Sequence, residues 1–499
     1  MESQTNKDVK KVAKGAGTAV TGRFLGRIFI FLTQVAIARL FGAEIFGLYA
    51  LGMATVRFSE LFSRLGLDKG GMMFVAIYRD ESPSKLKGVV YSATGFSFLC
   101  GSVLGILLYL FSGLISVYIF KEPQLQETIK LFAFCVPFFS SVTVVASLLQ
   151  GFYSIKYAVY SRDIIQPLVN LILIIIFYYF GFALSGAIFA FTLSNIFAFA
   201  AGIWYIHKAF GYLKIKYIKS QYEFKKLFSY STPFLFAGLL YYLFAWIDTL
   251  MLGFLGTAKD VGIYRAAIQA PLILYLFRFA LGNVVSPLFA TLYKNKEIRR
   301  FENIAKTTTR WMFYVILPLS IMLIFSAKEL MLIFGGEYVE GYPVLIVYTF
   351  SMIASCMAGG FEDILNMTGK QYIELLISFI IICSHIIINS FLIPMFGVIG
   401  AVITVSISTY SLLFARVLAL HYYLKITPFS INLLLLFIPG IITSFLLIAI
   451  NQLQDYIGIF GIVAVRVIVV ILIFGIYFKF NKNPQDQLMI DLIRKKMGM

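Results

Sequence analysis

The chain has 499 residues, of which 60% are hydrophobic and only 13% are charged, and its mean hydropathy is +0.87. This composition excludes a soluble globular protein, because a water-exposed surface needs far more charge. The net charge of +18 would suit a nucleic-acid-binding protein, but the basic residues lie in short clusters between apolar runs. We therefore expect no nucleic-acid partner.

Apolar runs of about 20 residues recur along the whole chain, which is the length that a helix needs to cross a bilayer. We predict an all-α, multi-pass protein of the cell (cytoplasmic) membrane with about fourteen transmembrane helices. In chain order, the predicted spans cover residues 16–41, 44–65, 88–119, 129–149, 163–180, 184–207, 229–254, 261–291, 307–327, 340–360, 372–395, 397–420, 428–450 and 457–478.

The distribution of Lys and Arg predicts the topology independently of hydropathy, because cytoplasmic connections are enriched in both residues. If the N-terminus is inside, about 29 of the 42 basic residues fall in cytoplasmic segments and about 5 in external ones. Basic clusters occur at 64–87, 208–226 and 294–306, whereas the turns near 181–184 and 395–397 carry no charge. We expect both termini to be cytoplasmic, and therefore an even number of spans.

An internal repeat divides the chain into two lobes. Residues 41–50 (FGAEIFGLYA) resemble residues 255–266 (LGTAKDVGIYRA), and residues 180–187 (FGFALSGA) resemble residues 396–401 (FGVIGA). Equivalent points are six spans apart, so the two halves have the same orientation, as in transporters built from parallel repeats. The repeat predicts an N-lobe of six helices at 1–207, a linker at 208–226, a C-lobe of six helices at 227–425, two further helices at 426–480, and a cytoplasmic tail at 481–499.

The linker at 208–226 mixes aromatic and basic residues. Tyr212, Tyr217 and Tyr222 alternate with lysines such as Lys214 and Lys219. This pattern suits an amphipathic segment that lies on an anionic cytoplasmic leaflet, although a solvated loop has the same composition.

Charged residues inside spans indicate where function is to be sought, since each costs about 2.5 to 3.5 kcal/mol at the bilayer centre. Arg23 and Arg27 share one face of the first span, and Arg57, Glu60 and Arg64 form a stripe on the second. Glu60 can pair with Arg57 or Arg64, but it cannot neutralise Arg23, Arg27 and Arg57 together. Two cationic stripes on adjacent helices predict a shared cavity that binds an anion.

In the second half, Asp248 and Arg265 lie at similar depths in the seventh and eighth spans. They form either an interhelical ion pair or, if Asp248 is free to bind a cation, part of a coupling site. Arg278 is deeper and about 220° around the helix from Arg265, so only one of them faces a cavity if that helix is straight. His385 and Arg466 are expected mainly to contact neighbouring helices; the alternatives are a proton carrier for His385 and a lipid-headgroup contact for Arg466.

No motif in the chain predicts catalysis, a cofactor or a metal site. The chain has no P-loop, HExxH or GxSxG motif, and the longest external connection, near 325–340, has about fifteen residues. The four cysteines form no CxxC pair and have no His at a ligand spacing. We expect a protein that is not an enzyme.

The segment at 34–49 (QVAIARLFGAEIFGLY), followed by Leu65, Gly66 and Leu67, resembles the opening of the polysaccharide-biosynthesis or O-antigen (Wzx-type) flippase family. Residues 248–256 (DTLMLGFLG) and 261–267 (VGIYRAA) resemble a second part of that family. The family belongs to the multidrug, oligosaccharidyl-lipid and polysaccharide exporter superfamily. This resemblance implies two six-helix lobes around a central cavity, two additional helices, and transport by alternating access.

The resemblance also implies a substrate and roles for particular residues. The substrate would be a lipid-linked diphosphate oligosaccharide, moved by a monomeric flippase in contact with membrane lipids and coupled to a cation such as H⁺ or Na⁺. Related lipid II flippases hold a pyrophosphate with arginines on the first, second and eighth helices, where this chain has Arg23 or Arg27, Arg57 and Arg265. Asp248 resembles an acidic residue of the cation site. The alternatives are a multidrug or other small-molecule exporter of the same superfamily and a membrane scaffold that transports nothing.

Overall fold

The computed structural model describes residues 2–210, 219–452 and 454–480, and these residues are helical almost throughout, with no strand in the described ranges. The all-α fold predicted from the sequence is confirmed. The chain divides into two compact units, Met1–Arg265 (unit 1) and Ala266–Met499 (unit 2). Unit 1 includes the seventh predicted span, so the lobe boundaries at 207 and 227 stay predictions.

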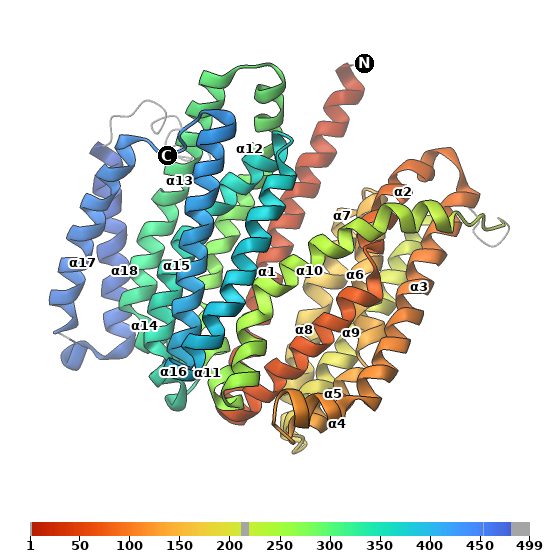
Figure 1. The fold of residues 1–499 in the computed structure, drawn as a ribbon, viewed down its shortest axis with the longest axis horizontal. Helices are drawn as coiled ribbons and strands as arrows, with labels where there is room; N and C mark the ends of the chain where they lie inside the picture. Colours follow the sequence, from red (N-terminus) through yellow and green to blue (C-terminus); the bar gives the residue numbers. More distant parts are fainter. Residues whose placement is uncertain (1, 211–218, 453, 481–499) are drawn as a thin grey trace. The chain divides into compact units, whose positions relative to one another are not determined.

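Unit 1 contains long apolar helices joined by short turns and π-helical segments (Figure 1). Its elements are α1 (Glu2–Arg64), α2 (Leu67–Glu81), α3 (Pro83–Leu110), α4 (Ser112–Leu114), η1 (Ile115–Ile119), α5 (Leu125–Ala133), α6 (Val136–Gly151), α7 (Ile155–Ala158), η2 (Val159–Ile165), α8 (Gln166–Tyr179), α9 (Leu184–Phe210), α10 (Phe224–Leu255) and α11 (Ala258–Gln269), which crosses the boundary between the units.

The helix α1 contains two predicted spans, because it is interrupted at Gly42. The backbone of Gly42 has φ 84° and ψ 174°, a conformation open to glycine but strained for residues with a Cβ. From there the chain runs back in the opposite direction, as Figure 1 shows. The break lies between the predicted spans at 16–41 and 44–65, so this prediction is confirmed.

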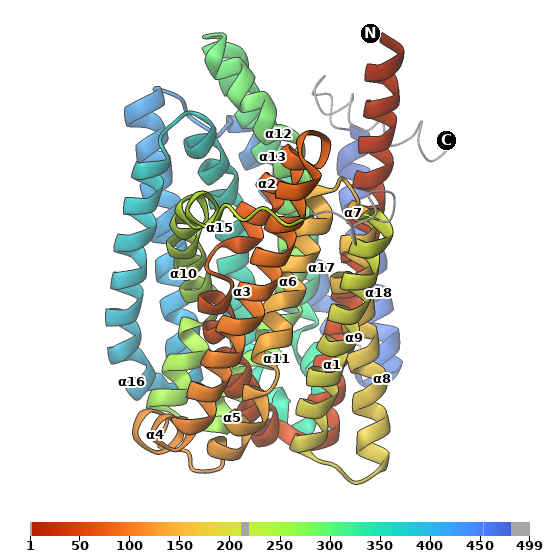
Figure 2. The same cartoon turned by 90° about the vertical axis from the view of Figure 1, so that its right-hand side faces the viewer.

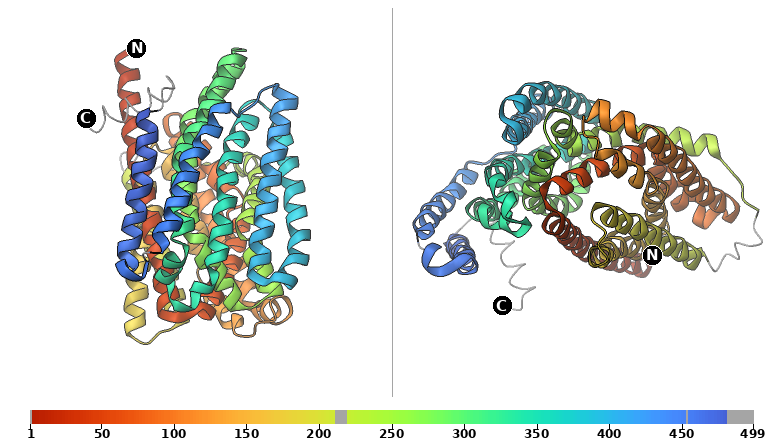
Figure 3. Two further views of the ribbon diagram at one scale, coloured as in Figure 1. Left: turned by 90° about the vertical axis from the view of Figure 1, so that its left-hand side faces the viewer. Right: turned by 90° about the horizontal axis from the view of Figure 1, so that it is seen from below.

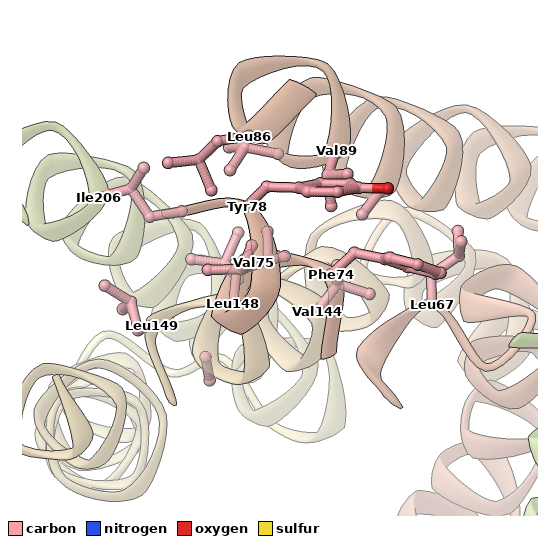
Figure 4. Packing of buried hydrophobic residues seen from close by; sticks show 14 of the residues in the cluster. Leu67, Phe74, Val75, Tyr78, Leu86, Val89, Val144, Leu148, Leu149 and Ile206 are labelled. Carbon is pink, nitrogen blue, oxygen red and sulfur yellow. The ribbon is translucent and has the colours of Figure 1, made fainter. Parts of the chain in front are cut away.

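A hydrophobic cluster in unit 1 holds α2, α3, α6 and α9 together (Figures 2 and 4). Phe74 and Val75 of α2 pack on Leu148 of α6, and Leu86 of α3 and Ile206 of α9 complete the same cluster. Every one of these side chains is buried, and inside a membrane their van der Waals packing holds the helices together. The cluster fixes the helices around which the charged side chains are placed.

The two copies of the first repeated motif pack against each other through equivalent glycines. Gly47 of α1 faces the backbone of Ala258 and Gly262 in α11, and Gly262 faces the backbone of Ala43 and Gly47. A Cβ at either glycine would overlap backbone atoms of the other helix. The glycines therefore allow α11 to approach α1 closely, and this contact places the residues that follow Gly262.

Unit 2 is also built from apolar helices, and α17 packs along α18 (Figure 3). Its elements are η5 (Pro271–Ile273), α12 (Leu274–Lys294), α13 (Ile298–Phe325), α14 (Ala327–Phe334), η6 (Gly336–Gly341), α15 (Tyr342–Met367), α16 (Gln371–Ala419), η7 (Leu420–Leu424), η8 (Ile431–Leu436), α17 (Phe437–Asn451) and α18 (Gln454–Phe480). Like α1, α16 reverses at a glycine, Gly397, whose φ is 57°.

Within the described residues, nine helices are long and apolar enough to cross a membrane, or ten if the bent pair α5 and α6 is one span. The chain is therefore a multi-pass membrane protein. The expected fourteen spans and the expected orientation stay predictions. The difference arises partly because α1 and α16 each count once although each reverses at a glycine, and because α17 is short.

Two predicted segments fall partly or wholly outside the described residues. Residues 211–218 belong to the predicted amphipathic linker, and residues 481–499 form the predicted tail.

Candidate functional site

Arg57 is the most unusual charged residue of unit 1, because aromatic rings rather than carboxylates surround it. Its guanidinium carbon lies 5.3 Å from the ring centroid of Phe139 in α6 and 5.4 Å from that of Trp246 in α10. Its Nε atom is buried without a hydrogen-bond partner among the described residues. Two cation–π contacts of this kind contribute on the order of 2 kcal/mol each when desolvated, but they satisfy none of the guanidinium's N–H donors.

The helix α10 is held beside Arg57 by a contact one turn before Trp246. The hydroxyl of Tyr242 donates a hydrogen bond to the backbone oxygen of Ala54 over 2.9 Å, and its ring packs on Phe58 with a centroid separation of 5.6 Å. Both Tyr242 and Ala54 are buried. This contact fixes the rotation of α10 and thereby the placement of Trp246.

Glu60 pairs with Arg64 instead of Arg57. The Arg64 guanidinium lies 3.6 Å from the carboxylate of Glu60 and 3.8 Å from that of Asp68. Both carboxylates are buried and share the same arginine. Of the two pairings expected for Glu60, the structure thus shows the one with Arg64. The Glu60 carboxylate attracts Arg57 only as a nearby charge.

The two arginines of the first span have different surroundings. Arg23 lies 3.8 Å from the carboxylate of Asp163 in η2, and its side chain is 49% exposed. Arg27 is also exposed, and it is close enough to Arg57 for their charges to repel. The structure therefore brings Arg27 toward Arg57, whereas Arg23 has a carboxylate partner.

Arg265 contacts the same tryptophan as Arg57. Its guanidinium carbon lies 4.2 Å from the ring centroid of Trp246, so one indole contacts the arginines of two different helices. Asp248, two residues after Trp246 along α10, is 6% exposed and engaged in an interaction of its own. Arg57, Trp246 and Arg265, with Arg27 nearby, are named the arginine–tryptophan cluster below.

In unit 2, Arg278 belongs to a separate network of ion pairs. Its Nη2 atom lies 3.1 Å from the Glu362 carboxylate, and its Nη1 atom contacts the Tyr275 hydroxyl. The same Glu362 oxygen lies 3.3 Å from Arg416, which also binds Glu374 through two nitrogens and the Ala358 carbonyl over 3.0 Å. Arg278 is thus neutralised by a carboxylate, unlike Arg57.

Arg466 and His385 of unit 2 contact polar side chains of other segments of that unit. Arg466 pairs with Glu329 over 2.9 Å, and both side chains are almost fully buried. The ring nitrogens of His385 lie 2.8 Å from Ser408 Oγ and 3.1 Å from Asn389 Nδ2. These contacts between helices agree with the roles expected for Arg466 and His385. In the part of the chain that the structure describes, no cluster of His, Cys, Asp and Glu could hold a metal ion.

Several residues of these sites were not predicted from the sequence. Trp246 lies in an apolar run, where a tryptophan gives no sign of contacting charge. Glu362, Glu374 and Arg416 lie near or within apolar runs, and this placement was a usable signal under the rule that charges in spans need partners. Their pairing was not predictable, because Arg416 is 42 residues from Glu374 and 54 from Glu362.

Comparisons with known proteins add independent findings. The family model described as polysaccharide biosynthesis protein matches residues 12–293, and the MatE model matches residues 233–391. A Shigella flexneri protein named "Putative O-antigen transporter" is 25% identical over 378 residues, which are 74% of this chain and 88% of that protein. The Staphylococcus aureus capsular polysaccharide biosynthesis protein CapF is 26% identical over 297 residues, 56% of this chain and 74% of that protein.

The fold is also found among solved structures. Lipid II flippase MurJ in an inward closed conformation matches with a TM-score of 0.73 at 17% identity, over 95% of this chain and 99% of that chain. An inward-facing multidrug resistance transporter of the MATE family matches with a TM-score of 0.66 at 12% identity, over 81% of this chain and 98% of that chain. At these identities the matches show a shared fold.

Proposed function

Because this chain belongs to the polysaccharide biosynthesis protein family, the Wzx-type flippases of the multidrug, oligosaccharidyl-lipid and polysaccharide exporter superfamily, we propose that it flips a lipid-linked oligosaccharide across the cell membrane. The family resemblance seen in the sequence is thereby confirmed. The transport would proceed by alternating access, and the arginines of unit 1 would hold the phosphate that joins the sugar to its lipid.

The observation that carries this proposal is the environment of Arg57. Its guanidinium is fixed between two aromatic rings, and no described residue accepts a hydrogen bond from it. A charged group in a membrane span requires a partner, water or an anionic ligand, because insertion at mid-bilayer costs about 2.5 to 3.5 kcal/mol. Arg64, Arg278, Arg416 and Arg466 have carboxylate partners of their own. Arg57 is therefore the arginine suited to a ligand.

A phosphate fits this site chemically. The planar guanidinium donates two parallel N–H bonds to one phosphate and stays charged at any physiological pH. Arg265 and Arg27 would add further positive charge near Arg57, so that a polyanionic headgroup is favoured over a neutral or cationic one. We assign Arg23 and Glu60 supporting roles, since each is already paired, and we leave Arg278 to its own ion-pair network in unit 2.

Asp248 has two possible roles that one pair of variants separates. If it binds the coupling cation, Asp248→Asn lowers transport without lowering the amount of folded protein. If it serves only as the ion-pair partner of Arg265, exchanging the two charges in a double variant restores transport. Restored transport in the exchanged variant therefore removes Asp248 from the coupling site.

A multidrug exporter is the alternative within the superfamily, and the MatE model match is compatible with it. An exporter of organic cations needs acidic groups where the ligand binds, whereas the arginine–tryptophan cluster is cationic. This alternative would be favoured if the protein exports a cationic dye and Arg57→Ala changes neither the export of the dye nor that of the glycan.

The proposal is tested by measuring glycan export in cells together with the abundance of the protein in the membrane. Arg57→Lys keeps the charge but loses the planar fork, so export should fall, and Arg57→Ala should reduce it further. The matched control is Arg300→Ala, because Arg300 is exposed and forms only a surface pair with Glu297. Full export by both Arg57 variants at normal abundance would contradict the proposal.

A second experiment tests access to the site. Single cysteines at positions 27 and 57 should react with a water-soluble thiol reagent, in a background from which Cys100, Cys135, Cys356 and Cys383 have been removed. Protection by a diphosphate-bearing lipid would support binding at these positions. If neither cysteine reacts from either side of the membrane, the arginines are structural.

A further inference from the structure

The indole of Trp246 is shared by two guanidinium groups from separate helices. Arg265 of α11 lies 4.2 Å from the ring centroid and Arg57 of α1 lies 5.4 Å from it, both within the range of a cation–π contact. The two guanidinium carbons are therefore at most 9.6 Å apart, which is the sum of these distances. Trp246 itself is only half-buried.

Two like charges this close repel each other, and each must be held by something other than the ligand when the site is empty. The Glu60 carboxylate pairs with Arg64 and attracts Arg57 only as a nearby charge, and Phe139 of α6 also contacts Arg57. Trp246 contacts both cations, and tryptophan gives the strongest cation–π contact among the aromatic residues. Its own position is set by α10, which Tyr242 fastens to the backbone of α1.

We propose that Trp246 is a positioning residue that keeps Arg57 and Arg265 together so that the site selects a diphosphate over a monophosphate. This inference rests on the proposed function, since it assumes that the arginines bind the lipid-linked phosphate. Trp246 does not bind the phosphate; it acts through the two guanidinium groups.

The selectivity follows from counting charges and acceptors. One phosphate group can accept a bidentate pair of hydrogen bonds from one guanidinium, and a second guanidinium nearby is then left with fewer acceptors and an excess of positive charge. A diphosphate offers a second phosphoryl group to the second arginine and neutralises more of the cluster. If Trp246 is removed, the arginines move apart and the advantage of the diphosphate decreases.

The test measures equilibrium binding of two radiolabelled probes with the same lipid, geranylgeranyl diphosphate and geranylgeranyl monophosphate, to the full-length protein in detergent. The variants are Trp246→Leu, which removes the aromatic face, and Trp246→Phe, which keeps a smaller one. The matched control is Trp204→Leu, because Trp204 also carries a cation, with Lys208 Nζ 5.2 Å from its ring, but lies on α9. Arg57→Ala reports on the proposed function itself.

We expect wild type and Trp204→Leu to prefer the diphosphate. Trp246→Leu should bind the diphosphate about tenfold more weakly, corresponding to the loss of ~1.4 kcal/mol, with little change for the monophosphate. Trp246→Phe should recover much of the preference, which a merely structural role would not predict. An unchanged ratio of affinities in Trp246→Leu overturns the positioning role while leaving the proposed function intact. Equal binding by wild type and Arg57→Ala, or no binding by either, overturns both.

Discussion

Replacing Arg416 by methionine should destabilise unit 2 more than the loss of any surface charge. The Arg416 side chain is 5% exposed and that of Glu374 is 7% exposed, and two hydrogen bonds join them. In Arg416→Met, the Glu374 carboxylate keeps only the Ser378 hydroxyl as a partner, over 2.9 Å. Glu362 is less affected, because it still pairs with Arg278. Leaving one buried charge unpaired costs about 3 to 5 kcal/mol.

The assay is reversible unfolding of the purified protein in mixed micelles, with the free energy of unfolding compared between variants. The double variant Arg416→Met/Glu374→Met removes both charges and should recover most of the loss, since replacing a whole buried pair by apolar residues is often neutral. Arg300→Met, which removes an exposed arginine, should change the stability by less than about 1 kcal/mol. A loss below about 1 kcal/mol in Arg416→Met would refute the reasoning, as would a double variant less stable than the single one.

Two other predictions concern unit 1. Gly47→Ala should destabilise the protein or block its folding, because the new Cβ overlaps backbone atoms of α11. The control Gly95→Ala has open space around the new Cβ and should be neutral or stabilising by up to about 1 kcal/mol. Thermal unfolding compares the two variants, and equal effects would contradict the close approach of α11 to α1. Glu223 accepts hydrogen bonds from Lys85 and from the Tyr78 hydroxyl. These bonds, the one from Lys85 above all, lower the pKa of the Glu223 carboxyl below the ordinary 4.5. The stability from these contacts is therefore present above pH 4.5 and lost as the pH falls below it, and Glu223→Gln should remove that part of the acid sensitivity; an unchanged acid profile would show that the contacts contribute nothing.

The sequence predicted helix content and several boundaries because hydropathy and glycine act locally. The gap between the first two spans coincides with Gly42, and the turn between the eleventh and twelfth with Gly397. The eighth span at 261–291 was wrong as a single helix. The structure has two helices there: α11 ends at Gln269, a 3-10 turn at Pro271–Ile273 follows, and α12 begins at Leu274. The helix breaks because proline has no N–H to continue the helical hydrogen bonds. The angle predicted between Arg265 and Arg278 on a straight helix therefore does not apply.

The sequence predicts individual residues of the candidate site only where a charged side chain lies in a membrane span, because burying that charge costs free energy. Arg57 was identified because a charge in an apolar span needs an explanation, and the structure shows that no described carboxylate pairs with it. The role of Trp246 depends on the contact of three helices, and no spacing in the sequence encodes that contact. Arg278 met the same sequence criterion as Arg57, but Glu362, from a distant segment, neutralises it.

The central claim is that Arg57 binds the phosphate of a lipid-linked sugar during transport, and translocation by the purified protein in liposomes tests it most directly. A fluorescent lipid diphosphate-linked sugar is placed in the membrane, and its movement between leaflets is followed by quenching from outside. Wild type and Arg300→Ala should move the lipid at the same rate, Arg57→Lys about tenfold more slowly, and Arg57→Ala more slowly still. Equal rates for all four proteins would contradict the account, because the guanidinium of Arg57 would then have no part in carrying the substrate.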